Sequence, residues 1–294
     1  MEHNVKQRSE RWFELRTGMV VTASRFADAI GVGKGKPYDF LRSLLDDDMS
    51  RDDGNLFTRH GTEMEPVIHE AYDLLTGNTT RESGFWTILD DNNPLKDKIG
   101  VSPDAVVLDP ATRKLVGLCE FKAPVYSMYR DIPRQYLVQM HGQMAVTGLP
   151  WCDFMAVCRT KREVMLRRVH FCPQFWNFIA RRLVQFCLAY KEHTTPDKEI
   201  SANTKITEIV KQWNYNNSPL PFESKVQVTD LLQCCGDLFF GPSGYWMNFE
   251  LLMGSYELND LEQRSINYEE EIRKVDEIIE EDRNFESEML ACDH

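Results

Sequence analysis

Two acidic residues and a lysine in the middle of the chain have the types and the spacing of a metal-dependent site. Asp104 follows a Ser-Pro pair, and Glu120 and Lys122 belong to an apolar segment after a turn at 109–113. In an extended strand, alternation puts Glu120 and Lys122 on one face and Phe121 on the other. Antiparallel pairing across the turn would bring Asp104 beside Glu120. Two carboxylates so close repel each other unless a divalent cation lies between them.

The ligands that this arrangement offers are those that Mg²⁺ prefers, with Mn²⁺ as a substitute. Asp104, Glu120 and the backbone carbonyl of Phe121 provide hard oxygen donors, and Mg²⁺ keeps several waters besides. A bound metal lowers the pKa of water and neutralises phosphate charge, as hydrolysis of a phosphodiester requires. Lys122 would orient or deprotonate that water, or stabilise the charge, and the sequence leaves these roles open. A Glu-x-Lys triplet alone is more often an exposed strand face, so it does not identify a site by itself.

The elements that would position these residues show first helical and then extended periodicity. Helices are predicted at 5–16, 24–30, 38–45, 60–75, 133–146 and 173–190, and strands at 85–89, 99–108, 115–121, 151–158 and 164–171. Thr22 or Ser24 would cap the helix at 24–30. This order predicts an α/β or mixed α+β fold, in which a central mixed sheet is flanked by helices. The folded unit is expected to span residues 1–195.

The last third of the chain differs from the rest in its charge. Residues 197–294 hold 8 Lys and Arg against 21 Asp and Glu, which leaves 26 against 25 for residues 1–196. We expect residues 196–294 to be an acidic, mainly helical C-terminal extension. Apolar residues alternate three and four apart over 258–279, which indicates an amphipathic helix. That helix would either pack on its own domain or mediate self-association or partner binding.

The remaining composition indicates a soluble chain. The first residues lack the apolar core of a secretory signal, and no apolar run has the length of a membrane span. Eight cysteines include no Cys-x-x-Cys pair, and Cys119, Cys152, Cys158 and Cys172 stand in apolar contexts. Buried thiols in a reducing compartment are therefore expected, with no membrane partner. The predicted location is the cytoplasm, or the host nucleus if the chain comes from a virus of eukaryotes.

Five stretches between residues 7 and 172 follow one another in the order of a known family. They are RWFELRTGMVVTAS, HGTEMEPVIHEAYDLLTG, GVSPDAVV, LCEFKAP and PRQYLVQMHGQMAVTG. They resemble the phage lambda exonuclease / YqaJ-like viral recombinase family, which belongs to the PD-(D/E)XK nucleases. The chain departs from the family pattern at Ala105, where a glycine is usual, and at Ala123, where a cysteine is usual. Neither position supplies a metal ligand.

The resemblance implies a restriction-endonuclease-like core and a set of site residues. Its catalytic positions are Glu65, Asp104, Glu120, Lys122 and Gln139. Asp104, Glu120 and the Phe121 carbonyl would bind the metal, while Glu65 would hold a water or a second ion. The positions that hold a 5′ phosphate in the family are Arg16 and Ser24 here.

The activity that the resemblance implies is Mg²⁺-dependent 5′→3′ exonuclease action on linear double-stranded DNA. The product would be a 3′ single-stranded overhang for recombination or repair, and a single-strand annealing protein is the implied partner. The family's toroidal trimer is one oligomeric state to consider, although the acidic extension could block that interface. Two alternatives stay open: a structure-specific or nicking endonuclease on the same core, and a catalytically silent scaffold that binds DNA ends.

Overall fold

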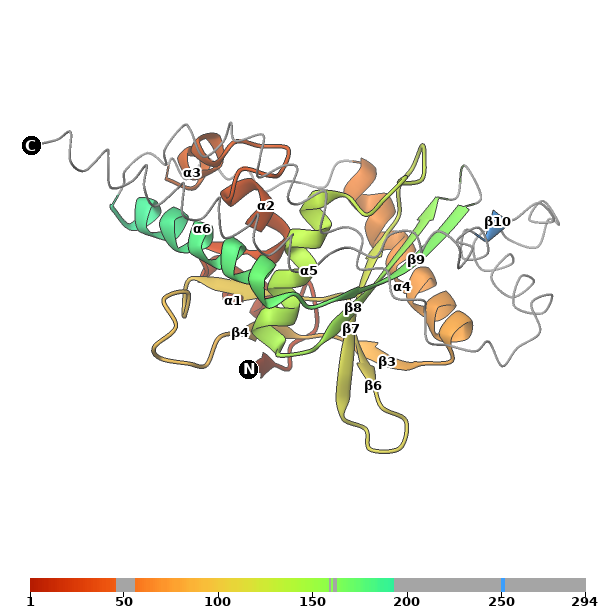
Figure 1. Cartoon of the computed structure of the whole chain (residues 1–294). Coiled ribbons are helices and arrows are strands. Elements are labelled where there is room, and N and C mark those ends of the chain that lie inside the picture. Colours follow the sequence, from red (N-terminus) through yellow and green to blue (C-terminus); the bar gives the residue numbers. More distant parts are fainter. Residues whose placement is uncertain (46–55, 159, 161–162, 193–249, 252–294) are drawn as a thin grey trace, which may run out of the picture.

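The computed structural model describes residues 1–45, 56–158, 160, 163–192 and 250–251. These residues form two β-sheets with helices packed against them (Figure 1). No helix within these ranges is long and apolar enough to cross a membrane. The predicted C-terminal extension and its amphipathic helix at 258–279 lie outside the described residues, except for the two-residue strand β10 (Glu250–Leu251).

The larger sheet has the strand order β10-β9-β8-β7-β6-β3. The bounds of its other strands are Thr79–Glu82 for β3, Ala105–Leu108 for β6, Leu115–Lys122 for β7, Trp151–Cys158 for β8 and Glu163–His170 for β9. β7 runs parallel to β8, and β9 runs parallel to β10, while the other neighbouring pairs are antiparallel. The predicted central mixed sheet is therefore confirmed, although β3 was not among the predicted strands.

The smaller sheet shows that the prediction of one continuous strand at 99–108 is wrong. Its strands, in the order β1-β4-β5-β2, are Glu2–His3, Phe85–Thr87, Ile99–Val101 and Val21–Thr22. β5 ends at Val101 in this sheet, whereas β6 begins at Ala105 in the larger one. Pro103 has no N–H to donate to a ladder, so the chain changes sheets across this proline. Asp104 consequently stands at the start of β6, beside the break.

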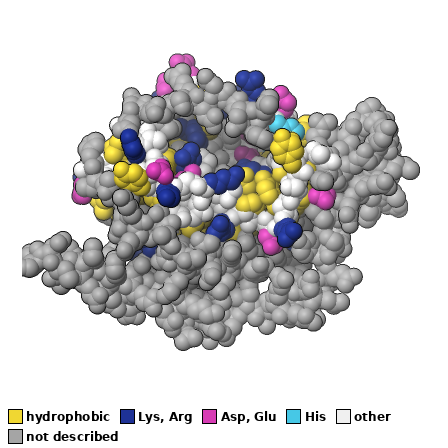
Figure 2. Space-filling view, turned by 90° about the horizontal axis from the view of Figure 1, so that it is seen from above, with side chains coloured by type: hydrophobic (Ala, Val, Ile, Leu, Met, Phe, Trp, Pro, Cys, Tyr) yellow, Lys and Arg dark blue, Asp and Glu magenta, His cyan; other side chains and the backbone are white. Residues whose placement is uncertain are grey.

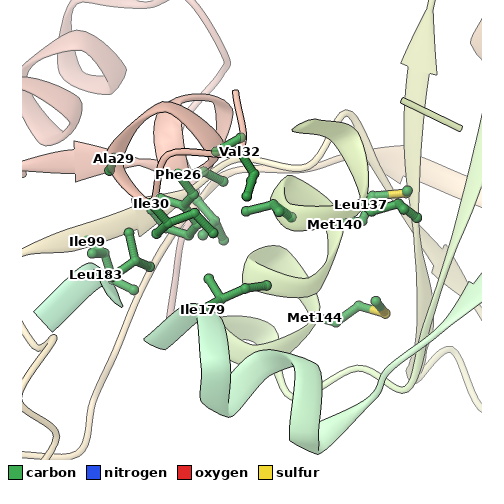
Figure 3. Packing of buried hydrophobic residues seen from close by; sticks show 14 of the residues in the cluster. Phe26, Ala29, Ile30, Val32, Ile99, Leu137, Met140, Met144, Ile179 and Leu183 are labelled. Atoms are coloured by element: carbon green, nitrogen blue, oxygen red, sulfur yellow. The ribbon is translucent and has the colours of Figure 1, made fainter. Parts of the chain in front are cut away.

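The two faces of the larger sheet are covered by different helices. Helix α4 (Leu56–Thr76) packs its apolar side on one face, and α5 (Arg134–Thr147) packs on the other. Helices α2 (Phe26–Ala29), α3 (Pro37–Leu45) and α6 (Pro173–Glu192) join the apolar cluster around α5 (Figure 3). Gly142 lets α5 lie very close to α2, since a Cβ at this position would stand 2.4 Å from the ring of Phe26.

The helix predictions are confirmed, although at 24–30 only Phe26–Ala29 is α-helical. α1 (Glu10–Thr17) and α3 to α6 match predicted helices, with ends that differ by several residues at the N-terminus of α1 and of α4. At 24–30 the chain instead forms a 3₁₀ turn over Ala23–Arg25 followed by the single-turn α2. Ser24 therefore lies inside the 3₁₀ turn and caps no α-helix, and Thr22 makes no side-chain cap bond.

Burial of His141 on α5 gives the folded protein a dependence on pH. The side chain is 2% exposed, and Nδ1 lies 2.8 Å from the carbonyl oxygen of Leu137. Burial lowers the pKa of His141 to about 4. In the unfolded chain a histidine has a pKa near about 6.5, so the unfolded chain takes up the proton first as the pH falls. The contribution of His141 to stability is complete above about pH 6.5 and is lost as the pH falls towards 4.

Replacing His141 by phenylalanine should therefore flatten the pH dependence of stability. A phenyl ring keeps the edge-on packing against Phe175, whose ring centroid is 4.7 Å away, and it cannot take up a proton. Between pH 6.5 and 4 the wild type should lose up to about 3 kcal/mol that the variant keeps. Urea unfolding at pH 8, 6 and 5 measures this, and the pH 8 value separates the packing change from the protonation effect. Parallel curves for the two proteins would show that His141 is not responsible.

Candidate functional site

Strand β7 places its acidic residue and its lysine on the face that α5 covers. Glu120 is fully buried there, and the Lys122 ammonium contacts its carboxylate. Phe121 points to the opposite face, where its ring packs near His69 and Tyr72 of α4. The alternation predicted from the sequence is thus confirmed, and the buried carboxylate must be balanced by groups from β7 and α5.

Helix α5 supplies two side-chain amides to the carboxylate of Glu120. Gln139 donates from Nε2 to Oε1, and Gln143 donates from Nε2 to Oε2, each over 2.7 Å. Only Gln139 was predicted as a site residue. The four-residue spacing of the two glutamines puts them on one helix face, and this was the available signal for Gln143. With both oxygens held, Glu120 has a fixed orientation in the core.

Asp104 reaches the same strand from the break before β6. Its Oδ2 accepts the backbone N–H of Phe121 over 2.6 Å, and its own N–H donates to the carbonyl of Cys119 over 3.2 Å. Burial raises the pKa of Asp104 well above its usual value; the charges of Glu120 and Glu65 act in the same direction, whereas Lys122 opposes them. The two carboxylates expected to converge therefore do so, and their repulsion is incompletely offset by protein groups.

Lys122 is the cation nearest to this acidic pair. Its Nζ contacts the Glu120 carboxylate, lies 3.0 Å from the carbonyl oxygen of Phe121, and stands 5.0 Å from the ring centroid of Tyr136. Burial disfavours the charged ammonium, but Glu120 and Asp104 outweigh that effect and raise the pKa of Lys122. Lys122 therefore touches two oxygens that the sequence assigns to a metal.

The donor set around Asp104 and Glu120 fits a divalent cation of the magnesium type. Two carboxylates and the Phe121 carbonyl provide hard oxygens, and an ammonium already contacts two of these three groups. Among the described residues, no group of three or more His, Cys, Asp or Glu side chains has the arrangement of a metal site. Mg²⁺ is commonly bound through one or two carboxylates and keeps several waters, which this donor set would allow.

Glu65 lies on α4, on the Asp104 side of the site. Its Oε2 accepts a hydrogen bond from Nη2 of Arg8 over 2.6 Å, and its side chain is 21% exposed. Arg8 was not predicted as a site residue, since it stands in a polar stretch just before the first of the five matched stretches. Glu65 is therefore a partly accessible carboxylate, and its contact with Arg8 fixes one of its two oxygens.

The two residues predicted to hold a phosphate stand near β2, in different surroundings. Arg16, in the last turn of α1, donates from Nη2 to Thr22 Oγ1 over 3.1 Å, and its guanidinium lies 4.4 Å from the ring centroid of Trp12. Burial lowers the pKa of Arg16 to about 10, so it remains charged at neutral pH. Ser24 is exposed in the 3₁₀ turn that follows β2.

Strand β7 ends at Lys122, whose side chain is 21% exposed. The β6–β7 hairpin points away from that end (Figure 1), and Figure 2 looks onto it from above. Lys and Arg side chains are visible on this face among the described residues, with a few acidic side chains between them.

Comparison with known proteins gives matches at the level of the domain and of the fold. Residues 11–150 match the model of the YqaJ-like viral recombinase domain. The alkaline exonuclease LHK-Exo from Laribacter hongkongensis is 25% identical, with 68% of this chain and 98% of that chain covered and a TM-score of 0.50. A second structure, LHK-Exo in complex with dAMP, shares 24% identity over 68% of this chain and 98% of that chain, with a TM-score of 0.51. No curated protein matches the chain.

Proposed function

We propose that the chain is a recombination-associated exonuclease that hydrolyses DNA with a divalent metal, because residues 11–150 match the model of the YqaJ-like viral recombinase domain. The observation that carries this proposal is the convergence of Asp104 and Glu120 with Lys122 at the end of β7. The likeness to an alkaline exonuclease that covers nearly the whole of that chain supports the same activity. We further propose that residues 1–195 make up the nuclease domain.

The side chains of the site would divide the reaction between them. A bound Mg²⁺ would supply an acidified water and would neutralise charge on the phosphate. Glu120, held by Gln139 and Gln143, and Asp104 would position that cation. Lys122 would orient or deprotonate the attacking water, or stabilise the negative charge that develops on the phosphate.

The direction of degradation would follow from recognition of a 5′ phosphate by Arg16 and Ser24. Arg16 is charged, and its guanidinium is held in place by Thr22 and Trp12. An arginine held in this way can make charge-assisted hydrogen bonds to a terminal phosphate without first losing side-chain freedom. We propose 5′→3′ degradation of one strand, which leaves a 3′ overhang that a single-strand annealing protein could bind.

A set of DNA substrates tests the proposed activity. The full chain is incubated with Mg²⁺ and with linear duplex DNA that carries a 5′ phosphate, a matching 5′-hydroxyl duplex, or a closed circular duplex. Shortening of the phosphorylated strand from its 5′ end, with the circle intact, is the expected result. Equal cleavage of the circle would instead support the nicking or structure-specific endonuclease. Binding of ends with no cleavage under any divalent metal would support the silent scaffold.

Arg16→Ala should remove the preference for a phosphorylated end. Loss of charge-assisted hydrogen bonds to the phosphate should lower the rate on the 5′-phosphate duplex by about 10–100-fold. The rate on the 5′-hydroxyl duplex should change little, because no terminal phosphate is lost there. Arg11→Ala is the matched control on the same helix, since Arg11 pairs with Glu14 at the surface. An Arg16→Ala protein that still prefers the phosphate by the wild-type ratio would contradict the assignment.

A further inference from the structure

An arginine outside every predicted motif reaches the site from the N-terminal segment. Nη2 of Arg8 lies 2.6 Å from Oε2 of Glu65, and the arginine side chain is 48% exposed. The two residues are distant in sequence, so this ion pair joins the segment before α1 to α4. Glu65 in turn stands near enough to Asp104 for its charge to act on that carboxylate. The ion pair therefore borders the acidic pair on its Asp104 side.

The residues on both sides of Arg8 are fixed by hydrogen bonds, which hold Arg8 in position for its contact with Glu65. Arg8 has φ of 61°, a left-handed conformation that residues other than glycine adopt at a cost. On one side of it, Gln7 donates from Nε2 to the carbonyl of Pro103 over 2.7 Å. On the other side, Ser9 caps α1 through the N–H of Trp12. Pro103 directly precedes Asp104. Residues 7–9 are therefore attached both to the break before β6, through Gln7, and to Glu65 on α4, through Arg8.

We propose that Arg8 is a positioning residue whose guanidinium holds the carboxylate of Glu65 at the Asp104 side of the site. Among the described residues, Glu65 forms no three-carboxylate metal group with Asp104 and Glu120, so it would act on a divalent cation there through a water. This inference rests on the proposed metal-dependent function of the same site. An exposed ion pair such as Arg8–Glu65 contributes little to the stability of the fold. The left-handed backbone at Arg8 has a cost in free energy, and orientation of the Glu65 carboxylate explains why that cost is retained.

Mn²⁺ binding to the full chain tests the proposal without relying on cleavage. Isothermal titration calorimetry with Mn²⁺ is run on the wild type, Arg8→Gly, Glu65→Gln and the double variant. Glycine suits the left-handed conformation, so the thermal midpoint of Arg8→Gly should stay within about 2 °C of the wild type or exceed it. The dissociation constant for Mn²⁺ should rise about tenfold in Arg8→Gly, as loss of an orienting partner typically causes. Arg8→Lys, which can keep the ion pair, should recover part of the affinity.

The double variant decides whether Arg8 acts through Glu65. In the Glu65→Gln background, Arg8→Gly should cause no further loss of Mn²⁺ affinity. An equal loss in both backgrounds, or unchanged affinity in Arg8→Gly alone, would overturn the role of Arg8 and leave the proposed function standing. A wild type that binds no Mn²⁺, or whose Mn²⁺ binding is unaffected by Glu120→Gln, would overturn the proposed function and this inference with it.

Discussion

Lys122→Ala should abolish nearly all cleavage of duplex DNA and, in the same protein, tighten the binding of Mn²⁺. Removing a positive group that stabilises developing charge in an enclosed site costs about 10²–10³-fold in rate. The gain in metal affinity has a different cause. The ammonium of Lys122 contacts the Glu120 carboxylate and the Phe121 carbonyl, and it therefore repels a cation that needs the same oxygens.

Two measurements separate these effects. The cleavage rate of a 5′-phosphorylated duplex is followed at saturating Mg²⁺, and Mn²⁺ affinity is measured by calorimetry on the same preparation. Lys114→Ala is the matched control, because Lys114 is exposed just before the start of β7 and should affect neither quantity. Lys122→Met keeps the apolar stem and should behave like the alanine variant.

A Lys122→Ala protein that cleaves at the wild-type rate would remove Lys122 from the reaction. Weaker Mn²⁺ binding in that protein would show that Lys122 organises the acidic pair more than it competes with the metal. Both outcomes are informative about the folded site only if the variant unfolds at a similar temperature. Thermal unfolding of each variant is therefore measured alongside. Without Lys122, the fully buried carboxylate of Glu120 keeps only its two glutamine donors, and the measurement shows whether this changes the stability of the fold.

The site residues on one strand were predictable because alternation acts within a few residues. Glu120 and Lys122 share a face of β7 whatever lies around that strand. The hairpin turn then brought Asp104 within reach of them. Gln143 was harder to predict, because two glutamines one turn apart on a helix are equally suited to solvent, and only the buried partner at Glu120 distinguishes them. Arg8 gave no periodic signal at all, since its contact depends on a left-handed backbone and a distant helix.

The fold was predictable where periodicity was long and uncertain where tertiary contacts decide. The strands β7, β8 and β9, of eight residues each, and the long helices matched their predicted segments. The apolar run at 99–108 continued through Pro103, so the sequence pattern could not show that its two halves belong to different sheets. Strands of two residues, such as β1 and β2, are defined by pairing and have no period of their own.

A buried ion pair on the other face of the sheet holds α4 against the strands. Asp153 of β8 is fully buried and accepts hydrogen bonds from Nε and Nη2 of Arg168, over 2.7 and 2.8 Å. It also accepts the hydroxyl of Tyr72 on α4 over 2.6 Å. The Arg168 guanidinium stacks 3.6 Å from the ring centroid of Trp151. The network links α4, which carries Glu65, to β8 and β9.

Asp153→Ala is expected to lower the free energy of unfolding by about 3–5 kcal/mol. The change removes the carboxylate and leaves the charge of Arg168 in a buried position without those two hydrogen bonds. Tyr72 loses its acceptor at the same time. Urea unfolding at pH 7 measures the loss, and Glu14→Ala is the control: it breaks an exposed ion pair with Arg11 and should cost less than about 1 kcal/mol.

The double variant Asp153→Leu/Arg168→Met distinguishes the cost of an unbalanced charge from the cost of lost packing. If the charge dominates, the double variant should be more stable than Asp153→Leu alone, because no buried charge then remains. If packing around Trp151 dominates, the second substitution should add to the loss, since methionine cannot stack as the guanidinium does. Cleavage at low temperature should survive in every folded variant, because Asp153 lies on the face of the sheet opposite Glu120. A loss of cleavage without a loss of stability would mean that the orientation of α4, and of Glu65 on it, depends on this network more than the fold does.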